Sequence, residues 1–360
     1  MSSKTLDMRS AYQLQWGRLS LVVLGLFAIL MLTISQGPMA ISFADTLRVL
    51  LSRGFGFDFE LSHSSEVIVS QIRLPRALLC ISIGAILAQC GAVMQGLFRN
   101  PLADPGIIGV SSGCAVGAAL AIVLFSKVSN SFDLPEQLSL VAVPLASFSA
   151  GLVTTLLIYR LGTSVNGTSV TMMLLAGIAI SALAGSLIGL MNYLADDQML
   201  RDLSLWQMGS LAGASQFNLI LSWTCLVIIS VFFQRDAKAL NALLLGESEA
   251  RHLGIDVQAL KRRLILLTAF GVGVAVACAG LIGFVGLVVP HLIRLILGPN
   301  HYQLIPYSAL LGAGLLLAAD TVARIVVSPA EMPVGLITAV LGAPFFLSLL
   351  LKQRNLLSGA

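Results

Sequence analysis

The second half of the chain is strongly apolar except for one long polar stretch, Leu245-Gly246-Glu247-Ser248-Glu249-Ala250-Arg251-His252-Leu253-Gly254-Ile255-Asp256-Val257. The order of its residues predicts a short helix. Two glutamates lie in the first turn and two basic residues in the last, where these charges suit the helix dipole. Gly254 is placed for a left-handed C-terminal cap, and Asp256 can begin the next helix as its N-cap. The stretch decides the fold because it sets a polar helix between two apolar segments.

Such a helix has two possible explanations. About two helical turns are only marginally stable alone in water, so the segment needs a surface to pack against. It is either a solvated loop with a fortuitous cap or a docking helix for a soluble partner. The docking interpretation involves Glu247, Ser248, Glu249, Ala250, Arg251, His252, Leu253 and Gly254.

The composition identifies the class of protein. The chain has 360 residues, of which 57% are hydrophobic and only 11% are charged. Soluble domains carry about 25% charged residues, so a water-facing globule would leave too much apolar surface exposed. The sequence therefore predicts an all-α polytopic membrane protein that is surrounded by membrane lipid and has no nucleic-acid partner.

The residues that usually carry chemistry are scattered. All five cysteines lie inside apolar runs, and neither they nor the four histidines have metal-ligand spacing, so we predict no metal site. No lysine follows a glycine, so the chain has no phosphate-binding loop of the GxxxxGK[ST] type and any nucleotide must bind to another chain. Neither a nucleophile–base pair nor a carboxylate pair lies within a span, and we expect the chain not to be an enzyme.

Hydropathy divides the chain into about ten membrane segments within a single transmembrane domain, residues 1–360. Residues 1–17 are predicted to be a cytoplasmic tail, and Leu19–Ser35 an uncleaved first helix. The four residues Arg73-Leu74-Pro75-Arg76 are expected to interrupt the next span. Residues 234–263 form the expected cytoplasmic region around the polar helix.

Leu287–Leu297, near the C-terminal end, is apolar but short. Crossing a hydrocarbon core about 30 Å thick takes about 20 helical residues. This segment is therefore predicted to be a broken or half helix.

The positive-inside rule sets the orientation. With both termini in the cytoplasm, 14 of the 21 lysines and arginines lie on the cytoplasmic side, and so does the polar helix. Arg73, Arg76 and Arg324 are exceptions at the outer ends of spans. They either pair within the bundle, where Asp320 is an obvious partner for Arg324, or form an outward basic patch for an acidic protein.

Small and polar residues mark the cytoplasmic ends of other spans. Asn100 and Leu102 follow one span, and Val170 and Thr171 begin another. These residues either cap helices or form the inner constriction of a pathway.

Several motifs, taken in order along the chain, resemble those of one family. They are Arg73-Leu74-Pro75-Arg76, Gly91-Ala92-Val93-Met94-Gln95, Asn100-Pro101-Leu102-Ala103-Asp104-Pro105-Gly106, Gly209-Ser210-Leu211, Leu245–Gly254, Gly283-Phe284-Val285-Gly286-Leu287-Val288-Val289-Pro290-His291, Ala319-Asp320, Ala330-Glu331-Met332-Pro333-Val334-Gly335 and Gly342-Ala343-Pro344-Phe345-Phe346. From about residue 65 to 352 the chain resembles the FecCD-type permease subunits of ABC importers for iron-siderophores, haem and vitamin B12. Tyr193-Leu194-Ala195-Asp196-Asp197-Gln198 with Trp206 is most similar to the haem (hemin) branch.

The resemblance implies a type II ABC importer permease fold that works as a homodimer in the bacterial inner membrane. Two cytoplasmic ATPase subunits, which hold ATP and Mg, would engage Glu247–Gly254, and this chain would bind no cofactor of its own. A periplasmic binding protein would place acidic residues on Arg73, Arg76 and Arg324. The inner gate would map to Asn100, Leu102, Val170 and Thr171.

The resemblance also implies a cargo, for which haem is our first hypothesis and a ferric siderophore or cobalamin the alternative. The pathway would be lined chiefly by the fifth helix, near Val170–Leu194. In that helix the soft or aromatic contacts available to haem are Met172, Met173, Met191 and Tyr193, which ordinary helix packing explains equally well. A stand-alone secondary transporter with broken helices is the competing class. The polar helix and the lack of a charge in mid-span favour the importer.

Overall fold

The architecture, taken from a computed structural model, is helical apart from one short β-hairpin in the part of the chain it describes. Described are residues 2–37, 39, 41–57, 59, 62–125, 136–165, 167–328 and 330–358. Six helices are long and apolar enough to cross a membrane, and four shorter helices are also apolar. The all-α class and the expected number of about ten apolar segments are confirmed.

The elements follow one another in a simple order. The N-terminal part contains α1 (Ser2–Ser35), α2 (Phe43–Phe55), α3 (His63–Val67), the π-helical turn η1 (Ile68–Arg73), α4 (Leu74–Leu97), the 3-10 turn η2 (Pro105–Ile108), α5 (Val110–Leu120) and η3 (Ala121–Phe125). The middle contains α7 (Glu136–Leu161), β1 (Thr163–Ser164), β2 (Gly167–Thr168), α8 (Val170–Leu194), α9 (Asp197–Gln207) and α10 (Gln216–Leu243). The C-terminal part contains α11 (Glu247–His252), α12 (Val257–Ala279), α13 (Val285–Leu297), α14 (His301–Val326) and α15 (Val334–Ser358).

Helix α4 is the buried centre of the bundle and packs against α10, α12, α13 and α14. Glycines let it approach two of these helices backbone to backbone. A methyl group added at Gly84 would lie 2.4 Å from the carbonyl oxygen of Gly312 in α14, and one at Gly91 would lie 1.8 Å from that of Gly286 in α13. These positions exclude any side chain, as small residues do wherever membrane helices pack closely.

The expected interruption at Arg73-Leu74-Pro75-Arg76 is wrong. The helix runs without a break from His63 to Leu97. It does so because η1 is wider than an α-helix: the Leu74 N–H donates to the carbonyl of Val69, five residues back. Pro75 follows this wider turn directly, as the second residue of α4.

The short segment near the C-terminal end is a half helix, as predicted. Helix α13 has only 13 residues and follows the non-helical residues 280–284. Its N-cap, Phe284, has a φ of 66°, a left-handed conformation that costs about 1–3 kcal/mol unless the surroundings enforce it. The Phe284 side chain fills the space over Gly342 of α15, where an added methyl group would lie 2.3 Å from it.

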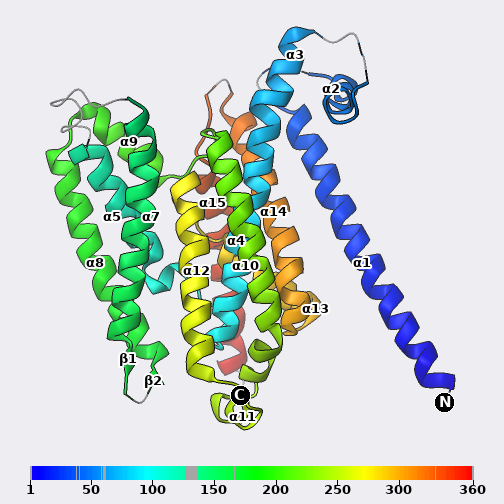
Figure 1. Ribbon diagram of the computed structural model, residues 1–360, viewed down its shortest axis with the longest axis vertical. Helices are drawn as coiled ribbons and strands as arrows, with labels where there is room; N and C mark the ends of the chain where they lie inside the picture. Colours follow the sequence, from blue (N-terminus) through cyan, green and yellow to red (C-terminus); the bar gives the residue numbers. More distant parts are fainter. Residues whose placement is uncertain are drawn as a thin grey trace.

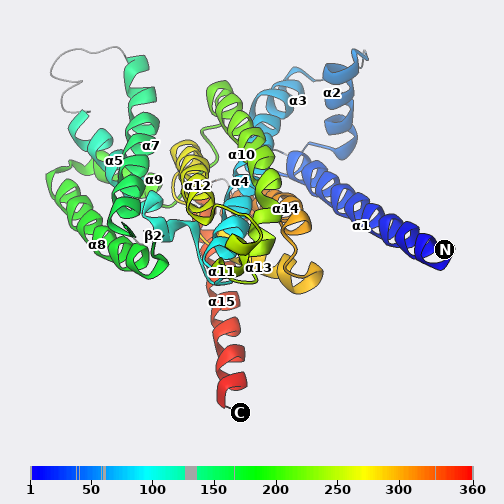
Figure 2. The same ribbon diagram turned by 60° about the horizontal axis from the view of Figure 1, so that its bottom comes forward.

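The two ends of the bundle carry different elements (Figure 1). Helix α11, the hairpin β1–β2 and both chain termini lie at one end, which we call the α11 end, and α2, α3 and α9 lie at the other, which we call the α3 end. Helix α1 leans away from the bundle toward its N-terminus, and the last turns of α15 project away from the other helices (Figure 2). Helices α5, α7 and α8 form a group beside the helices around α4.

Three segments contain more helix than hydropathy alone indicates. Residues 2–17, predicted to be a cytoplasmic tail, are helical and continuous with the first helix. The polar residues that follow α8 include helix α9, which Asp196 caps. The region 234–263 is mostly helical, since α10 extends to Leu243 and α12 begins at Val257, so only α11 and its flanking residues leave the bundle.

Candidate functional site

Helix α11 has the caps that the sequence predicts. Gly246 precedes it with a φ of 129°, and Gly254 follows it with a φ of 81°. The Ile255 N–H donates to the carbonyl of Ala250 at 3.1 Å, which closes the C-terminal cap. Asp256 caps α12 through a hydrogen bond of 2.9 Å from the backbone N–H three residues on. The local geometry is therefore set by residues within the stretch itself.

One face of α11 packs on the bundle and the other is exposed. Ala250 is fully buried, and Glu247 forms an ion pair with Lys261 of α12 at 2.6 Å. Lys261 is only 3% exposed and also donates to the carbonyl of Thr168, before α8, at 3.0 Å. The exposed residues at this site are Ser248, Glu249, Arg251, His252, Leu253 and Gly254. The helix thus presents a fixed polar surface at the α11 end.

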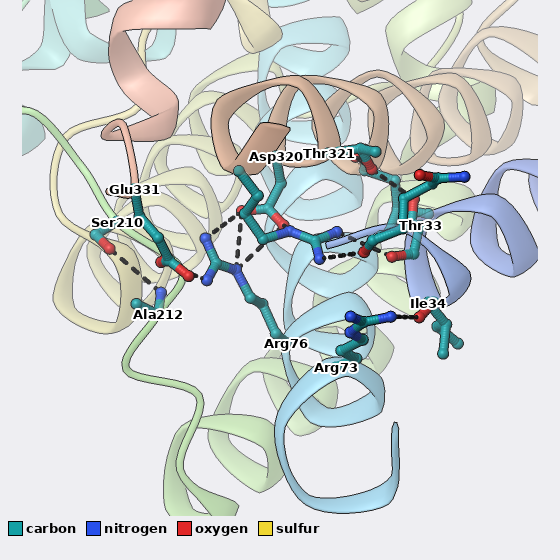
Figure 3. Close-up of polar contacts among 12 residues, drawn as sticks. Thr33, Ile34, Arg73, Arg76, Ser210, Ala212, Asp320, Thr321 and Glu331 are labelled. Atoms are coloured by element: carbon teal, nitrogen blue, oxygen red, sulfur yellow. Dashed lines mark hydrogen bonds and ion pairs between the residues drawn. The ribbon is translucent and has the colours of Figure 1, made fainter. Parts of the chain in front are cut away.

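At the α3 end, Asp320 is the centre of a buried ionic network (Figure 3). Its carboxylate is fully buried and accepts hydrogen bonds from Arg76 at 2.9–3.1 Å and from Arg324 at 3.0 Å. Arg76 also pairs with Glu331 at 2.7 Å. The network joins α4, α14 and the turn before α15.

Two arginines of this region cap the end of α1. Arg73 donates to the carbonyls of Ile34 and Ser35 at 2.9 and 2.8 Å. Arg324 donates to two further carbonyls around the same turn at 3.0 and 2.9 Å. The last carbonyls of a helix lack partners within it and carry the negative end of the dipole, so guanidinium groups stabilise this end.

The three arginines do not form an exposed basic patch, which is one of the two arrangements that the sequence left open. Arg73, Arg76 and Arg324 are 5%, 7% and 4% exposed. The alternative of pairing within the bundle, with Asp320 as the partner of Arg324, is the arrangement observed. The physical reason is that each guanidinium finds carboxylates or helix-end carbonyls on segments far away in the sequence, and these satisfy it without solvent.

The expected gate residues lie at the ends of helices that meet the α11 end. Asn100 follows α4, and its side chain accepts a local hydrogen bond of 2.9 Å from the Leu102 N–H. Val170 and Thr171 begin α8, which is capped by Ser169. The described hydrogen bonds of Asn100 and Leu102 are local and do not reach α8.

The four residues expected to line the pathway divide into two pairs. Met172 and Tyr193 are 53% and 85% exposed on α8. Met173 and Met191 are instead buried, at 0% and 4%, in the apolar cores between α8 and its neighbours. Met173 and Met191 therefore pack within this chain, the alternative that the sequence left open for these residues.

Helix α8 is nevertheless the most exposed of the long apolar helices. Only 17% of its most apolar window is buried within this chain, against 89% for the helix that contains α4. Leu175, Ile178 and Leu183 are each exposed by more than half. An apolar face of this extent requires lipid or another protein as cover.

Comparison with known proteins agrees with this architecture. The model of the FecCD transport family matches residues 24–352. The chain belongs to the FecCD transport family. It is a permease subunit of the ABC importer class and a multi-pass membrane protein, and the class implies an ATPase and a substrate-binding protein as partners.

Similar FecCD permeases come from bacteria and archaea. The chain is 48% identical over 288 residues to the hemin transport system permease protein HmuU of Yersinia pestis, covering 80% of this chain and 84% of the relative. It is 42% identical over 292 residues to the cobalamin import system permease protein BtuC of Halobacterium salinarum, covering 81% and 75%. An inward-facing structure of a metal-chelate type ABC transporter superposes with a TM-score of 0.78 at 32% identity, covering 92% of this chain and 97% of that one.

Two residues that matter to this site were not singled out from the sequence. Gln258 and Lys261 lie one turn apart in α12 and hold the backbone of Thr168 just before α8. In the sequence they look like ordinary polar residues at the end of a span. The sequence feature that could have pointed to Lys261 is its place beside the apolar residues Val257 and Leu260. In the structure, all three residues lie on the buried face of α12.

Proposed function

We propose that this FecCD permease imports haem across the bacterial inner membrane as a single transmembrane domain, with both termini in the cytoplasm. The observation that carries the importer mechanism is the capped, exposed helix α11 at the same end of the bundle as both termini (Figure 1). The haem assignment is supported by the higher identity to the hemin permease, 48%, than to the cobalamin permease, 42%. Cobalamin or a ferric siderophore is the alternative cargo.

The partners follow from the two ends of the molecule. Two cytoplasmic ATPase subunits would bind Glu247–Gly254 on α11, and ATP and Mg would reside on those subunits, with no cofactor on this chain. The exposed polar residues of α11 suit such a contact because Ala250 and Glu247 already fix the helix to the bundle. A coupling element has to be rigid on one side and accessible on the other.

At the opposite end, a periplasmic substrate-binding protein would dock on the α3 end. Arg73, Arg76 and Arg324 would contribute by fixing α1, α4 and α14 in place, since all three are buried and already paired. Glu331, whose side chain is 42% exposed, is the charged member of this network closest to solvent. The arginines would therefore influence docking indirectly.

The open face of α8 would pack against a second copy of the chain and line the pathway between the copies. Met172 and Tyr193 are on this open face, whereas Met173 and Met191 are not. Asn100, Leu102, Val170 and Thr171 would form the inner gate, because they lie where α4 and α8 reach the α11 end. A permease must release its cargo, so weak thioether and phenol contacts suit it better than strong haem ligands.

Transport by the purified complex tests the cargo. The permease, its ATPase and its binding protein are reconstituted in vesicles, and ATP-dependent accumulation of haem is measured against a ferric siderophore and cobalamin in competition. Preferential haem uptake is expected. Vesicles that accumulate cobalamin and exclude haem would refute the cargo while leaving the importer class intact. Failure of an ATPase to co-purify would favour a secondary transporter.

Histidine variants provide a second test of the cargo mechanism. His63 and His252 are exposed, and His291 and His301 are buried in helix contacts. If none of them ligates haem in the pathway, single replacements by alanine leave the preference for haem unchanged. A selective loss of haem uptake in one variant, with assembly intact, would identify an axial ligand and contradict passage without ligation.

A further inference from the structure

Both backbone groups of Thr168, the residue before the N-cap of α8, form hydrogen bonds with side chains of α12. Its carbonyl accepts a hydrogen bond of 3.0 Å from the Lys261 Nζ, and its N–H donates to the Gln258 Oε1 at 3.0 Å. Both side chains come from one face of α12, since residues three apart in a helix are neighbours. The two backbone groups of this residue are thus both fixed by α12.

The hairpin that contains Thr168 transmits this constraint to α8. Thr168 pairs with Thr163 in the β1–β2 ladder, and their hydroxyls lie 3.1 Å apart. The next residue, Ser169, donates its N–H to the carbonyl of Gly162 at 2.8 Å and is the N-cap of α8. A displacement of Thr168 therefore shifts the first turn of α8.

The same lysine is bound to α11. The Lys261 Nζ lies 2.6 Å from Glu247 Oε1, and among the described residues Glu247 is the carboxylate that pairs with it. The lysine side chain is 3% exposed, so water does not replace either partner. One buried ammonium group consequently bridges the first residue of α11 and the last residue before the α8 cap.

We propose that Lys261, supported by Gln258, is a positioning residue that passes movement of α11 to the inner end of α8. The proposal rests on the coupling role of α11 given above and names the contact through which that role reaches the pathway. When the ATPase displaces α11, Glu247 moves the ammonium group, and the ammonium group moves the carbonyl of Thr168. The hairpin then repositions Val170 and Thr171.

Arg263, two residues after Lys261, serves as a matched control. Arg263 also lies in the first turns of α12 and forms an ion pair at 2.6 Å, but its partner is Asp236 of α10. It has no described contact with the hairpin. Replacement of Arg263 therefore removes a charge and an ion pair from the same helix without touching the bridge.

The experiment measures the two ends of the bridge separately. Spin labels are placed at Leu245, beside α11, and at Val165, at the hairpin tip; both are largely exposed, and the five native cysteines are buried. In the reconstituted homodimer with its ATPase, each label gives one distance between the two copies. Distances are recorded without nucleotide and with ATP and vanadate. Both are expected to change in the otherwise unaltered protein.

Lys261→Met is expected to preserve the change at Leu245 and abolish the change at Val165, with transport per ATP lowered at least about fivefold, the lower end of typical coupling between sites. Arg263→Met should preserve both changes. Lys261→Arg keeps a donor for both partners and should also preserve them.

The charge swap Glu247→Lys with Lys261→Glu distinguishes the hydrogen bond to Thr168 from the ion pair between α11 and α12. It restores an ion pair between α11 and α12, but a carboxylate cannot donate to the Thr168 carbonyl, so the Val165 change should stay absent. A Val165 change like that of the unaltered protein, in Lys261→Met or in the swap, overturns the proposal. No nucleotide-dependent change at Leu245 in the unaltered protein would refute the coupling role of α11 itself. If Lys261→Met does not fold, the charge swap and Gln258→Leu test the proposal instead. Each removes one hydrogen bond to the Thr168 backbone, and each should abolish the change at Val165.

Discussion

Asp320→Asn is the substitution that tests the ionic network at the α3 end most directly. The carboxylate is fully buried and is shared by Arg76 and Arg324 (Figure 3). An amide of the same shape removes its negative charge and leaves the packing nearly unchanged. The variant therefore isolates the electrostatic contribution.

The loss of stability expected for Asp320→Asn depends on the partners that each arginine retains. Removing one partner of a buried ion pair costs about 3–5 kcal/mol. Arg76 retains Glu331 at 2.7 Å, and Arg324 retains two helix-end carbonyls at 2.9 and 3.0 Å. These remaining contacts place the expected loss near the lower value, about 3 kcal/mol. At about 2–4 °C per kcal/mol for a large domain, this lowers the melting temperature by about 6–12 °C.

The assay is thermal unfolding of the purified permease in detergent, followed by the loss of the monodisperse peak. Asp202→Asn is the control, because Asp202 is exposed and, among the described residues, its side chain accepts a hydrogen bond from Gln198 at 2.9 Å. Exposed charges contribute at most about 1 kcal/mol. A melting temperature for Asp320→Asn equal to that of the control would refute the reasoning.

A double variant checks the cause of the loss. Adding Arg324→Gln to Asp320→Asn removes the uncompensated buried cation, and replacement of both partners is much less costly than removal of one. We expect the double variant to recover part of the lost stability. A double variant less stable than Asp320→Asn would show that the contacts of Arg324 with α1, rather than the charge balance, dominate.

Three further predictions concern packing, topology and coupling. Gly91→Ala should prevent normal folding, because its methyl group would lie 1.8 Å from the backbone of α13. Gly25 has no atom within 4 Å of an added methyl group, so Gly25→Ala should leave the free energy of unfolding unchanged or raise it by about 0.5–1 kcal/mol. Cysteines at Ser62 and Leu245 should be labelled by an impermeant maleimide from opposite sides of the membrane, and labelling from one side would contradict the assignment of the two ends. Glu249→Lys should reduce ATPase pull-down several-fold at low salt with little change in melting temperature, since Glu249 is exposed and rim charges act mainly on association; unchanged binding would exclude this side chain from the contact.

The sequence alone determined the features that depend on neighbouring residues. The caps of α11 and α12 involve groups within five residues of one another, so their geometry can be derived from Gly246, Gly254 and Asp256. The apolar segments depend on hydropathy averaged over single helices, and they are found where the sequence places them. The shortness of α13 follows from counting residues against the thickness of the bilayer.

Only the tertiary structure decided which groups meet across long separations. Arg76 and Glu331 are 255 residues apart, and Lys261 and the Thr168 carbonyl are 93 apart. Charge and hydropathy patterns specify that a buried arginine needs a partner, but the identity of the partner depends on how the helices pack. For this reason the three arginines could be read from the sequence as a surface patch.

The four candidate pathway residues of α8 show the same limit within one helix. All four candidate residues lie in an almost uniformly apolar segment, so the sequence carries little information about which face turns inward. Packing against α5 and α7 buries Met173 and Met191 and leaves Met172 and Tyr193 exposed. In a membrane span the outer face is as apolar as the core, so helix orientation is set by the shapes of the neighbouring helices and not by the contrast between polar and apolar residues.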